Sequence, residues 1–136
     1  GKNYKHKCQK YISDNNLQNR VSFLSGLDLE EMAAIYQKAD IMVYPSIFEG
    51  FGIPILESLF CKTPVITTKG GCFSETGGNH SIYINPLSVS ELTAAITTVK
   101  SDSKLRQQMI EEGYKYAQNF TDEKVAQNLH KIYTSL

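Results

Sequence analysis

Residues 44–64 read Tyr-Pro-Ser-Ile-Phe-Glu-Gly-Phe-Gly-Ile-Pro-Ile-Leu-Glu-Ser-Leu-Phe-Cys-Lys-Thr-Pro, and this stretch decides the fold. The apolar run Ile41–Tyr44 leads into it and predicts a buried strand. Gly50 and Gly52 predict a turn, and Pro54 predicts the first turn of a helix, where no N–H donor is required. The sequence therefore predicts a strand, a glycine-rich loop and a helix in immediate succession.

The start of that helix is predicted to bind an anion. Free backbone N–H groups and the positive end of the helix dipole meet there, and the glycines let a ligand approach the backbone closely. Glu49 precedes the turn, and Glu57 lies about one turn into the helix, where a carboxylate can accept two sugar hydroxyls. A phosphate flanked by polyols is the outline of a nucleotide sugar. Taken singly, each glutamate is more readily explained as an ordinary solvated side chain or, for Glu57, as a partner of the helix dipole.

Short apolar runs alternate with amphipathic helical patterns along the chain. We expect strands at residues 21–24, 41–44, 65–68 and 82–84, and helices at 1–16, after a capping box at Asp28 and Glu31, after a second at Ser88 and Glu91, around 105–117, and after Thr121. This alternation predicts an α/β fold with a doubly wound parallel sheet covered on both faces, in three layers. Ligands bind such sheets beyond the carboxyl ends of the strands, so the loops at 25–27, 44–54 and 68–71 are expected on one rim.

Composition excludes several classes of partner. Fourteen basic and fourteen acidic side chains cancel, so no strong field attracts nucleic acid or an anionic bilayer. Cys8, Cys61 and Cys72 are too few and too scattered for a disulfide framework or a zinc site, and we expect free thiols in a reducing cytoplasm. We expect a single domain over residues 1–136, with 88–136 as its C-terminal helices.

A family resemblance joins these features. The segment Glu49-Gly50-Phe51-Gly52-Ile53-Pro54-Ile55-Leu56-Glu57 resembles the E-G-F-G-x-x-x-x-E segment of retaining glycosyltransferases of family 4, which have the GT-B fold. Residues 39–46, 64–75 and 84–86 are similar to neighbouring segments of that family in order and spacing. The resemblance covers residues 20–90. It implies the Rossmann-like, C-terminal, donor-binding half of a two-domain enzyme that transfers a hexosyl group with retention.

The resemblance also implies roles for individual residues. It assigns Glu49 to catalysis, facing the transferred sugar, and Glu57 to the ribose hydroxyls of the nucleotide. It assigns further donor contacts to the glycine-rich loop and to a second loop near the base, namely Gly50, Phe51, Gly52, Ile53, Gly26 and Leu27. The donor is expected to be a UDP-, GDP- or ADP-sugar. No metal and no cofactor are expected, since helix dipoles and basic side chains stabilise the departing diphosphate in that family.

Two departures from the family pattern affect these expectations. The family's domain begins one strand–helix unit earlier, with an Arg and Lys pair that grips the diphosphate, and Lys62 stands where the family commonly has glycine. An N-terminal domain would hold the acceptor, a glycan or a lipid, and would make any peripheral membrane contact. We therefore expect residues 1–136 alone to be inactive in transfer.

Three other interpretations stay open at this point. Two carboxylates also form the acid/base pair of glycosidases, but the glycine turn and helix start between them favour a phosphate. A non-catalytic α/β interaction module would keep the fold without the chemistry. A nucleotide-sugar epimerase of related two-domain fold would yield an epimer instead of a glycoside.

Overall fold

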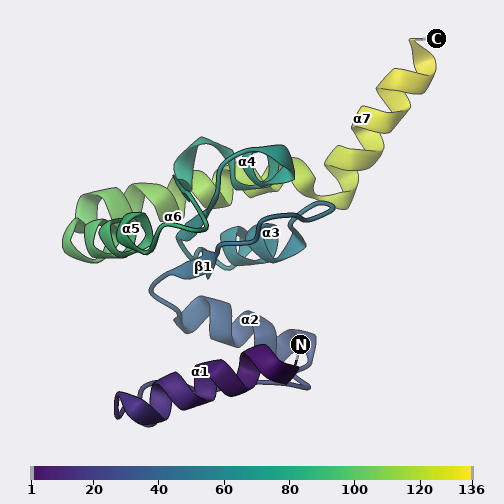
Figure 1. Cartoon of the computed structure of the whole chain (residues 1–136). Helices are drawn as coiled ribbons and strands as arrows, with labels where there is room; N and C mark the ends of the chain where they lie inside the picture. The colour runs from purple at the N-terminus through teal and green to yellow at the C-terminus, as the bar shows by residue number, and fades with distance from the viewer. Residues whose placement is uncertain (1, 136) are drawn as a thin grey trace.

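The computed structural model describes residues 2–135 and shows an α/β chain built on a small parallel sheet (Figure 1). The strands are β1 (Met42–Tyr44), β2 (Val65–Thr68) and β3 (Ile82–Ile84), in the order β1-β2-β3. The helices in the described range are α1 (Lys2–Asp14), α2 (Leu29–Lys38), α3 (Ile53–Phe60), α4 (Gly71–Gly77), α5 (Val89–Ser101), α6 (Ser103–Ala117) and α7 (Asp122–Thr134), with 3-10 helices η1 (Gly78–His80) and η2 (Gln118–Phe120).

Helices cover both faces of the sheet, as the sequence predicts. Successive strand residues point to opposite faces, so Val65 and Ile66 belong to different halves of the core. One half joins β2 to α3, α4 and α6 through the buried residues Ile55, Leu59, Val65, Phe73 and Ala117. The other half joins β2 and β3 to α5 and α6 through Ile66, Ile84, Ala95, Val99 and Met109. The three-layer α/β architecture is confirmed.

The helix starts follow the capping signals of the sequence. At α2, Asp28 Oδ1 accepts the Glu31 N–H at 2.9 Å and Glu31 Oε2 accepts the Asp28 N–H at 3.0 Å, which completes the expected capping box. At α5, Ser88 Oγ accepts the Glu91 N–H at 3.2 Å. The Glu91 carboxylate, however, accepts the N–H of Asn85 at 2.8 Å instead of closing the box. Glu91 therefore ties the end of β3 to α5.

The expected strand at residues 21–24 is wrong. These residues carry no strand pairing, and Val21, Phe23 and Leu24 are 40%, 50% and 60% exposed. A strand needs a neighbour for its N–H and C=O groups, and the described sheet ends at β1, which pairs with β2 alone. The apolar pattern of residues 21–24 does not show whether a pairing strand is present beside them. Gly26 and Leu27 consequently follow an unpaired segment and not a strand of this sheet.

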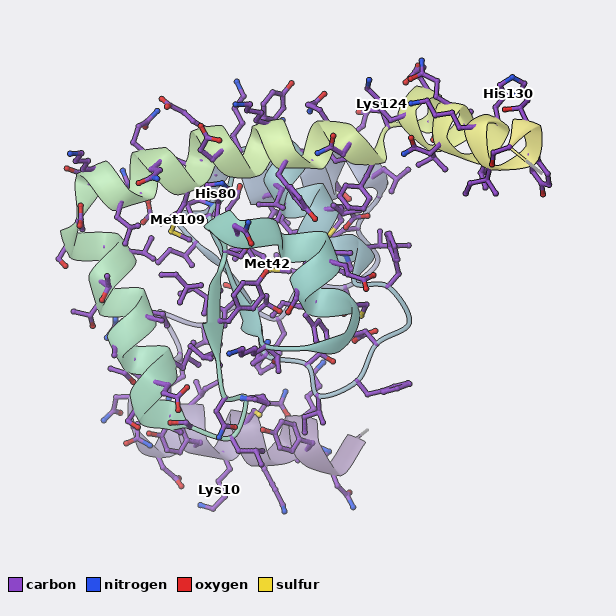
Figure 2. All side chains as sticks on the ribbon, turned by 90° about the horizontal axis from the view of Figure 1, so that it is seen from above. Lys10, Met42, His80, Met109, Lys124 and His130 are labelled. Atoms are coloured by element: carbon purple, nitrogen blue, oxygen red, sulfur yellow. The ribbon has the colours of Figure 1, made fainter. Side chains whose placement is uncertain are left out.

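The last helix leaves the body of the domain. Figure 1 shows α7, in yellow, extending away from the other helices, and Figure 2 places Lys124 and His130 on it, far from Met42 and Met109 in the interior. Apolar side chains along α7 remain exposed, among them Leu129 at 50% and Ile132 at 58%. Within residues 2–135, no helix has both the length and the apolar character needed to cross a membrane.

Gly78 gives a test of the packing between η1 and α6. Its φ is +62°, and an added Cβ would lie 2.7 Å from Cδ1 of Tyr116, a ring that is held by a hydrogen bond from its hydroxyl to the Glu75 carbonyl. Gly71 also has positive φ (+53°) but open space around it. Both alanine variants therefore carry a left-handed backbone cost of about 1–2 kcal/mol. We predict that Gly78→Ala costs about 1–3 kcal/mol more than Gly71→Ala in urea unfolding. Equal losses would contradict the packing described here.

Candidate functional site

The loop between β1 and α3 begins the site, and Gly52 makes the turn possible. Gly52 is the N-cap of α3 with φ +87°, a left-handed conformation that favours glycine, and Pro54 lies in the first turn as predicted. A Cβ at Gly52 would lie 3.1 Å from Thr76 Oγ1 and 3.3 Å from Ile55 Cδ1. Both the backbone angle and the available space therefore require glycine at this position.

The start of α3 presents unused backbone donors. No side chain caps the helix, and within residues 2–135 no acceptor takes the N–H groups of Phe51, Gly52 or Ile53. The first N–H groups of a helix carry the positive end of its dipole and are a natural anion site. The free N–H groups are compatible with the phosphate site that the sequence predicts at residues 51–53, and binding of a phosphate there stays a prediction.

Glu49 is held on the loop just before these donors. Its Oε1 accepts hydrogen bonds from the Tyr44 hydroxyl at 2.7 Å and from Ser46 Oγ at 2.9 Å. These two donors hold the pKa of Glu49 below its usual value, so the carboxylate is ionised at neutral pH. The same hydrogen bond, with some burial, raises the pKa of Tyr44 to about 12. Glu49 is thus an anion on the loop that precedes α3.

Glu57 lies one turn into α3, beside a pocket. Its Oε2 accepts a hydrogen bond from the Tyr36 hydroxyl of α2 at 3.2 Å. Burial, followed by the charge of Glu57, raises the pKa of Tyr36 to about 12. The pocket between α2 and α3 has a volume of about 260 Å³ and is otherwise apolar, lined by Leu29, Met32, Ala33, Tyr36, Phe60 and Cys61. Glu57 is the one carboxylate at this apolar pocket.

The rest of the sheet holds the loop in place. Thr67 Oγ1 donates to the Tyr44 carbonyl at 2.8 Å, and Thr68 Oγ1 donates to the Ser46 carbonyl at 2.7 Å. From α4, Cys72 Sγ donates to the Glu49 carbonyl at 3.4 Å. Side chains of β2 and α4 therefore fix the backbone of the residues that present Glu49.

Comparison with known proteins agrees with this geometry. The family model for glycosyl transferases group 1 matches residues 1–116. The chain belongs to this family. The domain is similar to the O-antigen chain mannosyltransferase RfbU of Salmonella typhimurium, with 36% identity over 97 residues that cover 71% of this chain and 28% of that protein.

Two solved structures have folds similar to that of this chain. The C-terminal domain of a group 1 glycosyl transferase, LpcC of Francisella tularensis, matches 87% of this chain and 62% of that chain with a TM-score of 0.74 and 28% identity. Anabaena HepE, solved with UDP and glucose, matches 99% of this chain and 37% of that chain with a TM-score of 0.86; at 24% identity this likeness shows the fold alone. The chain spans about a third of the length of the curated relatives it matches.

The predicted residues come from two segments of the glycosyltransferase domain. Glu49, Gly50, Phe51, Gly52, Ile53 and Glu57 all lie on the loop and first turns around the start of α3. Gly26 and Leu27 lie in the segment before α2. Leu29 is the residue of that region that lines the pocket at Glu57. The assignments of these residues to the donor stay predictions.

Three functional candidates escape the sequence analysis. The sequence indicates Tyr44 only as the end of a strand and Ser46 only as the residue that follows it, and it assigns no role to Tyr36. The spacing of Tyr44 and Ser46 carried a usable signal, because residues two apart in extended chain point to the same side. Tyr36 is 21 positions from Glu57, and no local spacing reveals that contact.

The anchoring of the loop yields a stability prediction. Thr68→Val removes the hydroxyl that donates to the Ser46 carbonyl, and we expect a loss of about 1 kcal/mol in urea unfolding with faster amide exchange at residues 46–50. The matched control is Thr97→Val, whose exposed hydroxyl bonds only within α5, and it should stay within about 0.5 kcal/mol of wild type. Unchanged exchange at residues 46–50 in Thr68→Val would contradict the anchoring role.

Proposed function

We propose that this glycosyltransferase domain is the C-terminal, donor-binding half of a retaining hexosyltransferase of family 4. The observation that carries the proposal is the start of α3, where unused N–H groups at residues 51–53 lie in the sequence between two partly exposed carboxylates, each held by a tyrosine hydroxyl. A diphosphate requires such donors, and the sugar and ribose on either side of it require hydroxyl acceptors. The family assignment supports the same activity.

The diphosphate is the leaving group, and its charge grows as the glycosidic bond breaks. Backbone N–H groups that are already oriented stabilise this charge without reorganisation, and one such donor is worth about 3–4 kcal/mol of the barrier in other enzymes. Phe51, Gly52 and Ile53 supply these donors, and Gly50 lets the donor approach the backbone. Helix dipole and N–H groups do this work in the proposed reaction, which needs no metal and no cofactor.

The two glutamates take different parts of the donor. Glu49 lies before the phosphate seat and faces the transferred sugar, where an ionised carboxylate steadies an oxocarbenium-like centre or holds its hydroxyls. Its lowered pKa argues against a glycosidase acid, which requires a raised one. Glu57 accepts the ribose hydroxyls, and Gly26 and Leu27 face the base.

The remaining parts of the proposal concern the whole protein. A nucleotide sugar (UDP-, GDP- or ADP-linked) is the donor, and an N-terminal domain holds a glycan or lipid acceptor and makes any peripheral membrane contact. The reaction takes place in the cytoplasm. The mannosyltransferase RfbU is a relative of this kind, which supports hexosyl transfer. Retention is tested by the anomeric configuration of the glycoside that the two-domain enzyme produces, and inversion would contradict it.

Donor binding tests the proposal on residues 1–136. With EDTA present, ligand-observed NMR should detect weak binding of one of UDP, GDP and ADP. Glu57→Ala should weaken that binding about tenfold or more, because it removes a charged hydrogen-bond acceptor worth about 1.5–3 kcal/mol. Glu123→Ala, on the protruding α7, is the matched control and should bind as wild type does. Absence of binding for all three nucleotides, or equal binding by Glu57→Ala, would contradict the proposal.

A further inference from the structure

Each glutamate of the site is held by one tyrosine hydroxyl. We propose that Tyr36 and Tyr44 are positioning residues, each occupying one oxygen of a glutamate so that the other oxygen is set to accept a hydroxyl of the donor. This inference rests on the proposed function, because it assigns the free oxygens to ribose and sugar. It adds two positioning side chains to the site.

At Glu49, all the protein donors converge on one atom. Oε1 accepts from the Tyr44 hydroxyl at 2.7 Å and from Ser46 Oγ at 2.9 Å. Among residues 2–135, no donor reaches Oε2. A partly exposed carboxylate can satisfy both oxygens with water, so two protein donors on one oxygen serve orientation more than solvation. The second oxygen is left for a sugar hydroxyl.

At Glu57, the same arrangement comes from a different element. Oε2 accepts from the Tyr36 hydroxyl at 3.2 Å, and no donor in the described part of the chain reaches Oε1. Tyr36 is only 9% exposed and lies on α2, whereas Glu57 lies on α3. The contact therefore fixes the carboxylate against a neighbouring helix and leaves one oxygen for the ribose.

Both tyrosines are themselves held by buried threonines. Thr67 Oγ1 donates to the Tyr44 carbonyl, and Thr63 Oγ1 donates to the Tyr36 carbonyl; the two threonines are 0% and 2% exposed. These bonds fix the backbone from which each tyrosine side chain projects, and the bond of each tyrosine hydroxyl to a glutamate then limits the rotamers of both side chains before the ligand arrives. Each glutamate is thus connected through a tyrosine to the rigid frame of the domain, which is the condition for a pre-organised site.

The two tyrosines should affect different ligands. Because Glu49 faces the sugar, Tyr44→Phe should weaken binding of the nucleotide sugar about 3- to 10-fold and leave the nucleoside diphosphate unchanged. Because Glu57 faces the ribose, Tyr36→Phe should weaken both by a similar factor. The probes are UDP, GDP and ADP and their glucose and mannose derivatives. The variants are compared with the nucleoside diphosphate, and the nucleotide sugar derived from it, that the wild-type chain binds. Tyr133→Phe, an exposed tyrosine on α7, is the matched control.

A second readout requires no ligand. The titratable groups around the Glu49 loop are the Tyr44 hydroxyl of β1 and the Cys72 thiol of α4, which donates to the Glu49 carbonyl and not to its carboxylate. The Tyr44 bond is the largest cause of the lowered pKa of Glu49, ahead of Ser46. Tyr44→Phe should therefore raise the pKa of Glu49 toward its ordinary value. As the pH is lowered, the carboxylate of the variant should then become protonated at a higher pH than that of wild type. Carbon-13 NMR titration of the carboxyl group measures this, and Ser46→Ala, which leaves the sheet intact, should move it in the same direction.

The outcomes separate this inference from the proposed function. If the wild-type chain binds the nucleotide and the nucleotide sugar, and both tyrosine variants bind them with the same affinities, the positioning roles are overturned and the proposed function is not. Equal loss of nucleotide and nucleotide sugar in Tyr44→Phe, or an unchanged pKa of Glu49, would overturn the assignment of Tyr44. A wild-type chain that binds none of the probes would overturn the proposed function and the positioning roles with it.

Discussion

The turn from β1 into α3 is the constraint on which the structure of the site depends. Gly52 adopts φ +87°, and a Cβ added there would lie against the side chains of Thr76 and Ile55. The turn therefore favours glycine at this position. This turn leaves the first N–H groups of α3 without acceptors in the described part of the chain. The buried residues Ile55 and Leu59 then fix α3 against the sheet. A core helix thereby offers its N-terminus to a ligand.

The two carboxylates of the site, Glu49 and Glu57, would repel the phosphates of the proposed donor. They bring negative charge next to a predicted diphosphate, and this repulsion is acceptable only if the glutamates bind sugar hydroxyls and keep away from the phosphate. Tyr44 and Ser46 hold one oxygen of Glu49, and Tyr36 holds one oxygen of Glu57; we propose that these bonds direct the other oxygens toward the hydroxyls. The site therefore combines a positive backbone end with two oriented anions, and this combination suits a ligand that alternates polyol, diphosphate and polyol.

Sequence reasoning succeeded where the signal is local. The strand before Tyr44, the glycine turn, the helix start at Pro54 and the cap at Asp28 all depend on neighbouring residues, and the structure has each of them. It failed at residues 21–24, because an apolar pattern does not show whether a pairing strand is present. It also missed Tyr36 and Thr63, whose contacts join residues 21 and 27 positions apart. Long-range hydrogen bonds of this kind come from packing and leave no periodicity in the sequence.

We propose that the N–H groups at the start of α3 bind the phosphates of the donor, and the rest of the site depends on this contact. The most direct measurement is a proton–nitrogen-15 NMR titration of residues 1–136 with inorganic pyrophosphate and with the nucleoside diphosphate that binds. We expect the largest amide shifts at Phe51, Gly52 and Ile53, with saturation at one site. Shifts that leave these three amides unmoved and occur elsewhere, for example around His80 of η1 and Glu112 of α6, would contradict it.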